Sequence, residues 1–214
     1  MTKAQAQAQN EATIRPLISH LETMYEGING KLFGGKLEPV VIVIQSDTTK
    51  GAYGWYTTDK RWNVQGTKRG YHEITLTAEN MARPFPEIAT TLVHEMVHHF
   101  CNSQGIKDTS RAGWYHNDAF RTACEEHGME FPKGKDPKNG WAHPALTADT
   151  LAWIMQEYNT VEFVLYRQAI KKGARGTKKS NSIKYVCPCC GAIVRATKEV
   201  NIKCADCDET MVVS

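Results

Sequence analysis

Two histidines four residues apart, His94 and His98, lie on either side of a glutamate and could bind one metal ion. In a helix, residues four apart share a face one turn apart. Both imidazoles could therefore reach one tetrahedral zinc ion at about 2.0–2.1 Å. Glu95 lies beside the pair, where it could act as a base that activates a zinc-bound water without being a ligand. The pattern predicts a hydrolytic metal site, although the same spacing also arises by chance in buried helices.

The choice of ligands has an alternative, because Glu95 and His99 are also four residues apart. We favour His94 and His98, since this choice leaves a carboxylate beside the metal to act as the base. We expect His99 to support the site or to pack in the core. A catalytic zinc takes three protein ligands, and His116 is the best third candidate because the intervening loop would let it fold back. The other candidates are His127, which we expect to cap a helix end, His143, Asp118, Glu125 and Glu126.

The elements that must position these residues can be read from the pattern of apolar residues. We expect Thr91–Phe100 to lie in a helix that begins near Pro84 and Pro86 and stops at Gly105. Further helices are expected at Ile14–Ile28, after the segment Trp114–Phe120 up to Gly128, and at Leu146–Tyr158. Strands are expected at Val40–Ile44, buried on both faces, at Gly51–Tyr56, and at His72–Thr77, with His72 at the surface. The segment Trp62–Arg69 is predicted to be a turn. The segment Val161–Tyr166 could be either a helix or a strand.

The composition is that of an ordinary globular protein, with 214 residues, 41% hydrophobic and 23% charged. No apolar run approaches the roughly 20 residues of a membrane span, so we expect no membrane partner. The first 13 residues are polar and lack the hydrophobic core of a signal peptide, so we expect a flexible tail and a cytoplasmic location, with nucleoid association as an option. In that compartment the seven cysteines should be thiols or metal ligands.

Four C-terminal cysteines form two C-x-x-C pairs, Cys187 with Cys190 and Cys204 with Cys207. Two such pairs are typical of a closed structural zinc site in a zinc ribbon. Cys189 lies inside the first pair and could substitute for a neighbour. The remaining two, Cys101 and Cys124, fall in expected helices and should be buried as small apolar side chains.

A basic segment, residues 167–184, precedes the cysteine pairs and contains no acidic residue. Clustered cations release counterions from nucleic-acid phosphates, so we expect DNA binding that does not depend on base sequence. The alternative is a solvated, flexible linker, because glycine and serine accompany the charge. The residues expected to contact DNA are Lys171, Lys172, Arg175, Lys178, Lys179 and Lys184.

In these features the chain resembles the SprT-like family, which includes the Spartan proteases. The likeness comprises Leu32–Leu37, the strand segments Gly51–Tyr56 and Glu73–Thr77, the helix Thr91–Phe100, and His116 within Trp114–Phe120. One departure is visible, since the family commonly has Gly-His-Gly around its third histidine, where this chain has Tyr115 and Asn117.

The resemblance implies an α+β fold, with a small zincin-like metallopeptidase domain (a mixed sheet plus an active-site helix) at residues 14–166. A basic linker at 167–184 and a zinc ribbon with four cysteine ligands at 185–214 would follow. It also implies one catalytic and one structural zinc ion. The implied activity is zinc-dependent cleavage of proteins associated with DNA, with His94, His98 and His116 as ligands and Glu95 as the base.

Three residues, Tyr115, His99 and Arg111, are candidates to stabilise the oxyanion. Two alternatives stay open. The chain could be a non-catalytic nucleic-acid-binding or regulatory protein that keeps the zinc fold as a scaffold, or a metal-dependent hydrolase of other bonds. The sequence does not indicate an oligomeric state.

Overall fold

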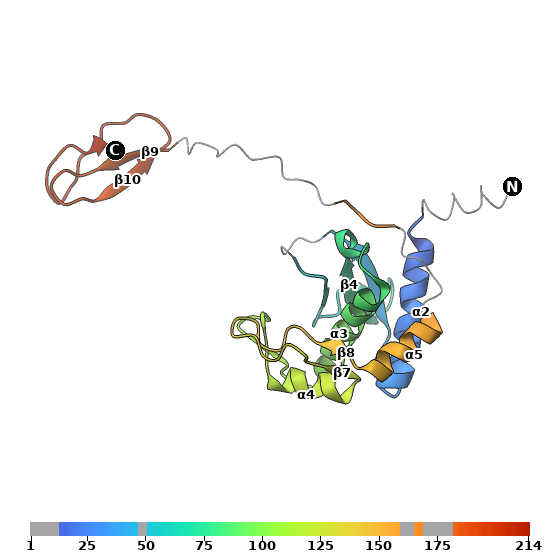
Figure 1. Ribbon diagram of the computed structural model, residues 1–214. Coiled ribbons are helices and arrows are strands. Elements are labelled where there is room, and N and C mark those ends of the chain that lie inside the picture. The colour runs from blue at the N-terminus through green and yellow to red at the C-terminus, as the bar shows by residue number, and fades with distance from the viewer. Residues whose placement is uncertain (1–12, 47–50, 159–164, 169–181) are drawn as a thin grey trace. The chain divides into compact units, whose positions relative to one another are not determined.

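The computed structural model describes residues 13–46, 51–158, 165–168 and 182–214 (Figure 1). The chain divides into two compact units, residues 1–169 and 170–214, and each has its own core. Most of the predicted N-terminal tail and residues 161–164 of the undecided segment lie outside the described residues. So do five of the six residues expected to contact DNA, Lys171, Lys172, Arg175, Lys178 and Lys179.

The first unit combines helices with a mixed sheet, so the predicted α+β class is confirmed. None of the helices among the described residues is long and apolar enough to cross a membrane. In chain order the elements of this unit are α2 (Arg15–Leu32), β1 (Val40–Gln45), β2 (Gly54–Tyr56), β3 (Trp62–Asn63), β4 (Gly70–Thr77), η1 (Ala78–Asn80), α3 (Phe85–Ser103), β5 (Thr109–Ser110), β6 (Tyr115–His116), α4 (Asp118–Glu126), β7 (Met129–Glu130), β8 (Ala145–Leu146) and α5 (Ala148–Tyr158).

The main sheet has the order β1-β4-β2, with β1 parallel and β2 antiparallel to β4. The strand β1 lies at an edge and only Ile42 in it is fully buried, so the expectation of burial on both faces was wrong. A continuous β-branched run is typical of central strands, but the pattern does not reveal which strand lies at the edge. The segment Trp62–Arg69, expected to be only a turn, begins with β3, which pairs with the start of β4.

The helix α3 lies at the centre of the first unit, where it packs against β2, β4, α4 and α5 (Figure 1). Pro84 caps its first turn and Pro86 lies within that turn, as the sequence predicts, because the missing N–H groups have no partner there anyway. One side of α3 is buried in the apolar core, together with the apolar side of α2. The buried apolar residues of α3 are Ile88, Ala89, Leu92, Val93, Met96, Val97 and Cys101.

The second unit contains a small antiparallel sheet with β9 (Ile183–Val186) between β10 (Ile193–Ala196) and β11 (Val212–Val213). Its core consists of Tyr185, Met211 and two of the cysteines. The predicted linker residue Lys184 lies within β9 and pairs with Arg195 of β10.

Candidate metal centres

Three histidine side chains converge in the first unit. The Nε2 atom of His98 lies 3.1 Å from Nε2 of His94 and 3.1 Å from Nε2 of His116. All three ligand atoms lie within 4.8 Å of one another. Two nitrogens bound to one tetrahedral zinc at about 2.0–2.1 Å would be separated by a similar distance, roughly 3.3 Å. The arrangement therefore suits a single ion that faces three imidazoles.

Two of the three histidines, His94 and His116, are held in the form that binds metal. Burial, with smaller effects from His98 and His116, holds the pKa of His94 well below its usual value. Burial likewise lowers the pKa of His116 to about 4. The neutral imidazoles of His94 and His116 therefore dominate at neutral pH, and each keeps a lone pair for a cation.

His98 is oriented by a carboxylate that the sequence did not single out. Asp108, in the loop after α3, has Oδ2 2.6 Å from Nδ1 of His98. If Nδ1–H donates to Asp108, the lone pair of Nε2 is left facing the other two histidines. A carboxylate behind a ligating imidazole fixes both its tautomer and its ring orientation.

His116 is positioned by the loop 136–141. The backbone N–H of His116 donates to Asn139 O, and Trp141 N–H donates to His116 O, both at 3.0 Å. Asp136 braces the turn, because its side chain accepts the N–H groups of Lys138 and Asn139. Gly140 (φ 71°) lies directly against the His116 carbonyl, where a Cβ would collide with it.

The departure from Gly-His-Gly around His116 is accommodated without strain. Asn117 has a φ of −88°, an ordinary backbone conformation that needs no glycine. Its side-chain Oδ1 accepts the N–H groups of Ala119 and Phe120 and so caps α4. Its Nδ2 donates to Lys107 O at 2.7 Å, which joins the start of α4 to the loop that carries Asp108. The asparagine therefore adds two connections that a glycine would lack.

Glu95 lies next to the triad and is only 5% exposed. Burial raises the pKa of its carboxyl to about 7, against smaller opposing effects of His98 and the backbone N–H of Tyr56. The strand β2 approaches this carboxylate closely. A Cβ on Gly54 would lie 2.7 Å from Thr75 O and 3.4 Å from Glu95 Oε1. Glu95 thus has the proton affinity and the fixed position of a general acid–base group.

His99 packs in the core, one of the two roles predicted for it. It is 1% exposed, and its Nδ1 lies 3.1 Å from Tyr25 Oη. Tyr56 stacks on its ring, with centroids 5.1 Å apart. His72 joins the same cluster and is 8% exposed, so its expected position at the surface was wrong. These contacts turn His99 toward the core, which removes it as an oxyanion donor.

The other two oxyanion candidates contact each other. The Arg111 guanidinium lies over the Tyr115 ring at 4.5 Å and donates to Lys138 O at 3.3 Å. Of the remaining candidate ligands, His127 caps the end of α4, since its Nδ1 lies 2.6 Å from Ala123 O. His143 is exposed but close enough to lower the pKa of His94 and His116 slightly, so it borders the site.

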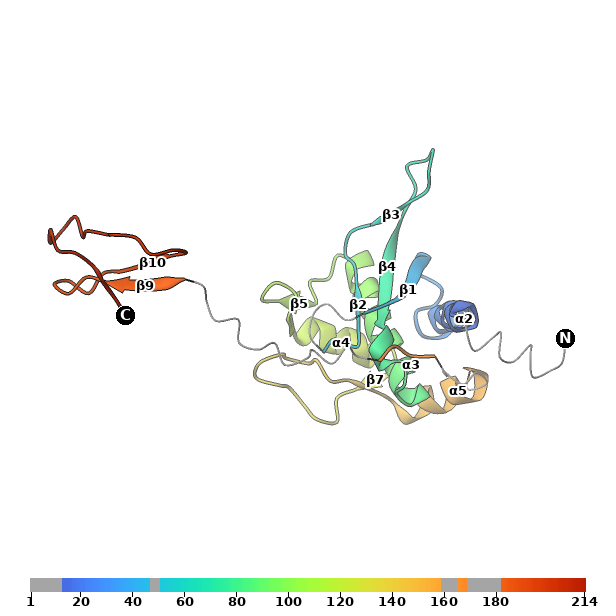
Figure 2. The same ribbon diagram turned by 90° about the horizontal axis from the view of Figure 1, so that it is seen from above.

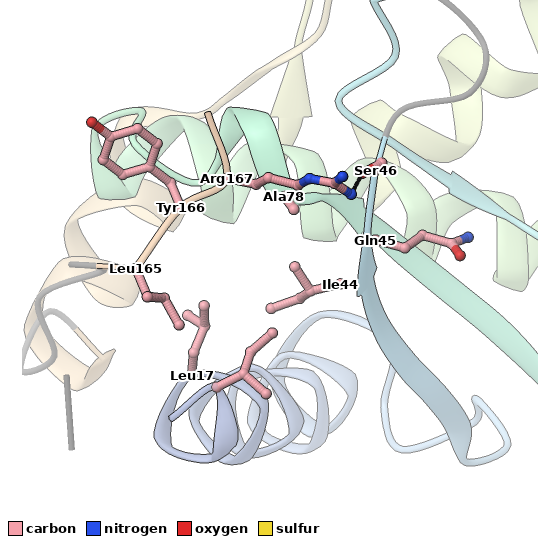
Figure 3. A pocket seen from close by; sticks show the side chains of 9 residues that line it. Leu17, Ile44, Gln45, Ser46, Ala78, Leu165, Tyr166 and Arg167 are labelled. Atoms are coloured by element: carbon pink, nitrogen blue, oxygen red, sulfur yellow. Dashed lines mark hydrogen bonds between the residues drawn. The ribbon is translucent and has the colours of Figure 1, made fainter. Parts of the chain in front are cut away.

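A pocket of about 350 Å³ lies elsewhere in the first unit, between α2, β1 and residues 165–167 (Figure 3). Its lining is mostly apolar and includes none of the three histidines. Arg167 fixes one wall, because its backbone N–H donates to Ala78 O at 2.9 Å and its guanidinium donates to Ser46 Oγ. Arg167, which begins the basic segment, is therefore bound to the folded unit.

Four cysteines form the second candidate centre. The sulfurs of Cys187, Cys190, Cys204 and Cys207 lie within 4.8 Å of one another, and Cys190 Sγ is 3.6 Å from Cys204 Sγ. Backbone N–H groups, chiefly that of Cys190, lower the pKa of Cys187 to about 7. The donor set and its spacing suit a closed tetrahedral ion. Cys189 is exposed and does not belong to this group.

The two C-x-x-C turns, or knuckles, at Cys187–Cys190 and Cys204–Cys207 have the same backbone geometry. The residue after each pair has a positive φ, 73° at Gly191 and 54° at Asp208. In each turn the N–H of that residue donates to the carbonyl of the first cysteine, at 3.0 Å in the first knuckle and 2.9 Å in the second. The left-handed residue lets the chain turn back so that both thiols of a pair face the same point.

A mixed α+β unit with a histidine triad on and beside its central helix, together with a four-cysteine centre, defines a protein with two candidate metal-binding sites. The sequence profile of the SprT-like family matches residues 21–137, more than half of the chain. The chain therefore belongs to the SprT-like family. Parallel comparisons with curated proteins and with solved structures gave no significant match.

Proposed function

We propose that this protein is a zinc-dependent endopeptidase that acts on proteins associated with DNA. The observation that carries the proposal is the convergence of His94, His98 and His116 beside the buried carboxylate of Glu95. A site that served only as a scaffold would need the histidines but would gain nothing from a buried carboxylate beside them. Burying an acid costs free energy, which a proton-transfer role would justify.

The donor set supports zinc in both centres. Three imidazoles and an open position are typical of catalytic zinc, and four thiolates are typical of structural zinc. A zinc ion bound by the triad would lower the pKa of a bound water and polarise the scissile carbonyl.

Glu95 would perform the proton transfers. With a pKa of about 7, its carboxylate can accept a proton from the attacking water and later donate that proton to the leaving amine. The backbone N–H of Tyr56 holds the carboxylate in place during both transfers. Asp108 keeps the His98 ring oriented so that its Nε2 atom faces the other two imidazoles.

The assignment of DNA-associated substrates rests on charge. Six basic residues were expected to contact DNA, and Lys184 is the one among them that the structure describes. It pairs with Arg195 on the sheet of the second unit. Directly paired strand residues project from the same face, so these two cations lie side by side. Two adjacent cations suit the phosphate backbone of nucleic acid.

The test measures metal content and cleavage of casein, with and without single-stranded DNA, for the wild type and for Glu95→Gln. We expect two zinc ions per chain in both proteins, and DNA-stimulated cleavage in the wild type only. Full cleavage by Glu95→Gln would contradict the assigned base. Two zinc ions without cleavage under any condition would favour the non-catalytic nucleic-acid-binding protein. Cleavage of small esters or amides but not of proteins would favour a hydrolase of other bonds.

A further inference from the structure

The hairpin formed by residues 59–71 projects from the first unit. It contains β3, a turn and the start of β4, and Figure 2 shows it extending beyond the rest of the sheet. Residues 60–69 are all exposed. The hairpin carries one acid, Asp59, against four cations, Lys60, Arg61, Lys68 and Arg69. Its length and composition make it a positively charged arm.

The arm is held in shape by its own hydrogen bonds. Val64 N–H donates to Arg69 O at 3.0 Å, and Thr67 N–H donates to Val64 O at 3.1 Å to close the turn. The Thr67 hydroxyl donates to Val64 O and accepts the N–H of Arg69. The charged groups are therefore presented on a defined scaffold.

The root of the arm is fastened to the helix that carries the triad. Asn102 lies one helical turn after His98, and its Nδ2 donates to Tyr56 Oη at 2.8 Å and to Thr58 O at 3.2 Å. Whatever the arm binds would therefore be held on the first unit, by a hairpin whose root is hydrogen-bonded to α3.

One face of the arm combines aromatic rings with cations. Trp62 pairs directly with Tyr71, so both project from the same face. The Arg69 guanidinium lies over the Tyr71 ring at 4.9 Å. Trp62 is 45% exposed although its Nε1 donates to Glu73. An exposed ring held by a hydrogen bond at its edge leaves its face open for stacking.

Most of the charge on the arm is not neutralised within the protein. Lys60 forms an ion pair with Glu38 at 2.6 Å. For Arg61, Lys68 and Arg69, no carboxylate of the described residues lies within ion-pair distance. These three cations, on the same hairpin as an exposed indole, therefore face solvent.

We propose that this hairpin binds single-stranded nucleic acid, with its cations on the phosphates and Trp62 stacked on a base. Cationic surfaces with interleaved aromatic rings are how proteins bind single strands without reading sequence. This surface consists of other residues than those of the ribbon and the basic segment, and its binding does not depend on whether the chain cleaves peptide bonds. It would bring nucleic acid to the first unit itself.

The experiment uses the full chain loaded with zinc and a fluorescein-labelled oligo-dT probe, with binding followed by anisotropy from 50 to 200 mM salt. The charge-reversed variant is Lys68→Glu/Arg69→Glu. We expect about tenfold weaker binding at the lowest salt, and a salt slope reduced by about 1.4, since each phosphate contact on a single strand contributes about 0.7. Trp62→Leu should weaken binding about fivefold or more with an unchanged slope.

The matched control is Lys36→Glu/Lys133→Glu, which makes the same charge change at two exposed positions of the same unit outside the hairpin. Tryptophan fluorescence verifies folding of each variant. The proposal is overturned if the control loses as much affinity as the hairpin variant, or if the hairpin variant binds like the wild type. It is also overturned if polyglutamate of equal charge displaces the oligonucleotide as well as unlabelled oligo-dT does, since that would indicate an acidic protein partner.

Discussion

Asp108 Oδ2 lies 2.6 Å from Nδ1 of His98, on the side of the imidazole away from the other two histidines. We expect Asp108→Ala to weaken metal binding at the triad about 10- to 100-fold, because the freed ring can rotate and change its tautomer. Competition with a fluorescent zinc chelator measures the two sites by their different affinities.

The cysteine centre is the internal control for this variant, since it shares no residue with the triad. Asp108→Asn should lose less than Asp108→Ala, because an amide oxygen can still accept the N–H. Unchanged affinity at the triad in both variants would show that Asp108 does not orient His98.

Two glycines with opposite surroundings give a paired test of the approach of β2 to the site. Gly54→Ala should destabilise the first unit by about 1–3 kcal/mol, because the new Cβ would meet the Thr75 carbonyl at 2.7 Å. Gly30→Ala, on α2 with nothing within 4 Å, should stabilise it by about 0.5–1 kcal/mol.

Urea unfolding followed by tryptophan fluorescence measures both glycine variants. All five tryptophans lie between residues 55 and 153, so the signal reports on the first unit alone. If both substitutions change the free energy of unfolding by the same amount, the close contact at Gly54 is not present in solution.

Tyr25 should make the first unit less stable as the pH rises in the alkaline range. Burial, with smaller effects from Tyr56 and Glu38, raises the pKa of the Tyr25 hydroxyl well above its usual value, and the hydroxyl donates to Glu38 O at 2.6 Å. Above about pH 10 the unfolded chain loses this proton while the folded chain keeps it. Stability should therefore fall with pH, by about 1.4 kcal/mol per pH unit for this group.

Tyr25→Phe removes this contribution to the slope while leaving the ring in the core. It should be less stable than the wild type at pH 8, by about 1 kcal/mol for the lost hydrogen bond, and should lose less on going to pH 11. Tyr166→Phe, at an exposed position, is the control. Equal slopes for the wild type and Tyr25→Phe above pH 10 would contradict the assignment.

The seven cysteines should fall into three reactivity classes with iodoacetamide. In the zinc-loaded protein we expect only the exposed Cys189 to react readily. Removal of zinc with a chelator should expose the four clustered thiols, because the ribbon core is too small to stay folded without metal. Cys101 and Cys124 should stay protected in both states, since burial raises the pKa of both thiols, to about 12 for Cys101.

Peptide mass spectrometry distinguishes these classes. If Cys189 is protected in the loaded protein and one of the other four reacts instead, Cys189 is a ligand. Equal reaction of all five ribbon cysteines before chelation would argue against a metal at this centre.

Short-range patterns predicted the elements that carry the site. The four-residue spacing of His94 and His98, the prolines before α3 and the paired C-x-x-C motifs each depend on local geometry, which sequence spacing determines. The same spacing could not predict Asp108, because one aspartate in a polar loop looks like any other acid until the fold brings it to His98.

Long-range pairing explains the errors at the sheet. The β-branched run in β1 indicates a strand but not its place at the edge, which depends on partners far away in the sequence. His72 was expected at the surface because β4 alternates, yet the rings of Tyr56 and His99 cover it. Neither contact has a sequence signal of its own.

The loop 136–141 has a consequence for where the first unit can be cut. The family match ends at residue 137, whereas the hydrogen bonds that fix His116 come from Asn139 and Trp141. A fragment trimmed at residue 137 would retain all three histidines and Glu95. It would lose the two backbone hydrogen bonds that hold His116 in place. The part of this unit that holds the third histidine in place is therefore larger than its recognisable signature, and a fragment for expression should extend at least through Trp141.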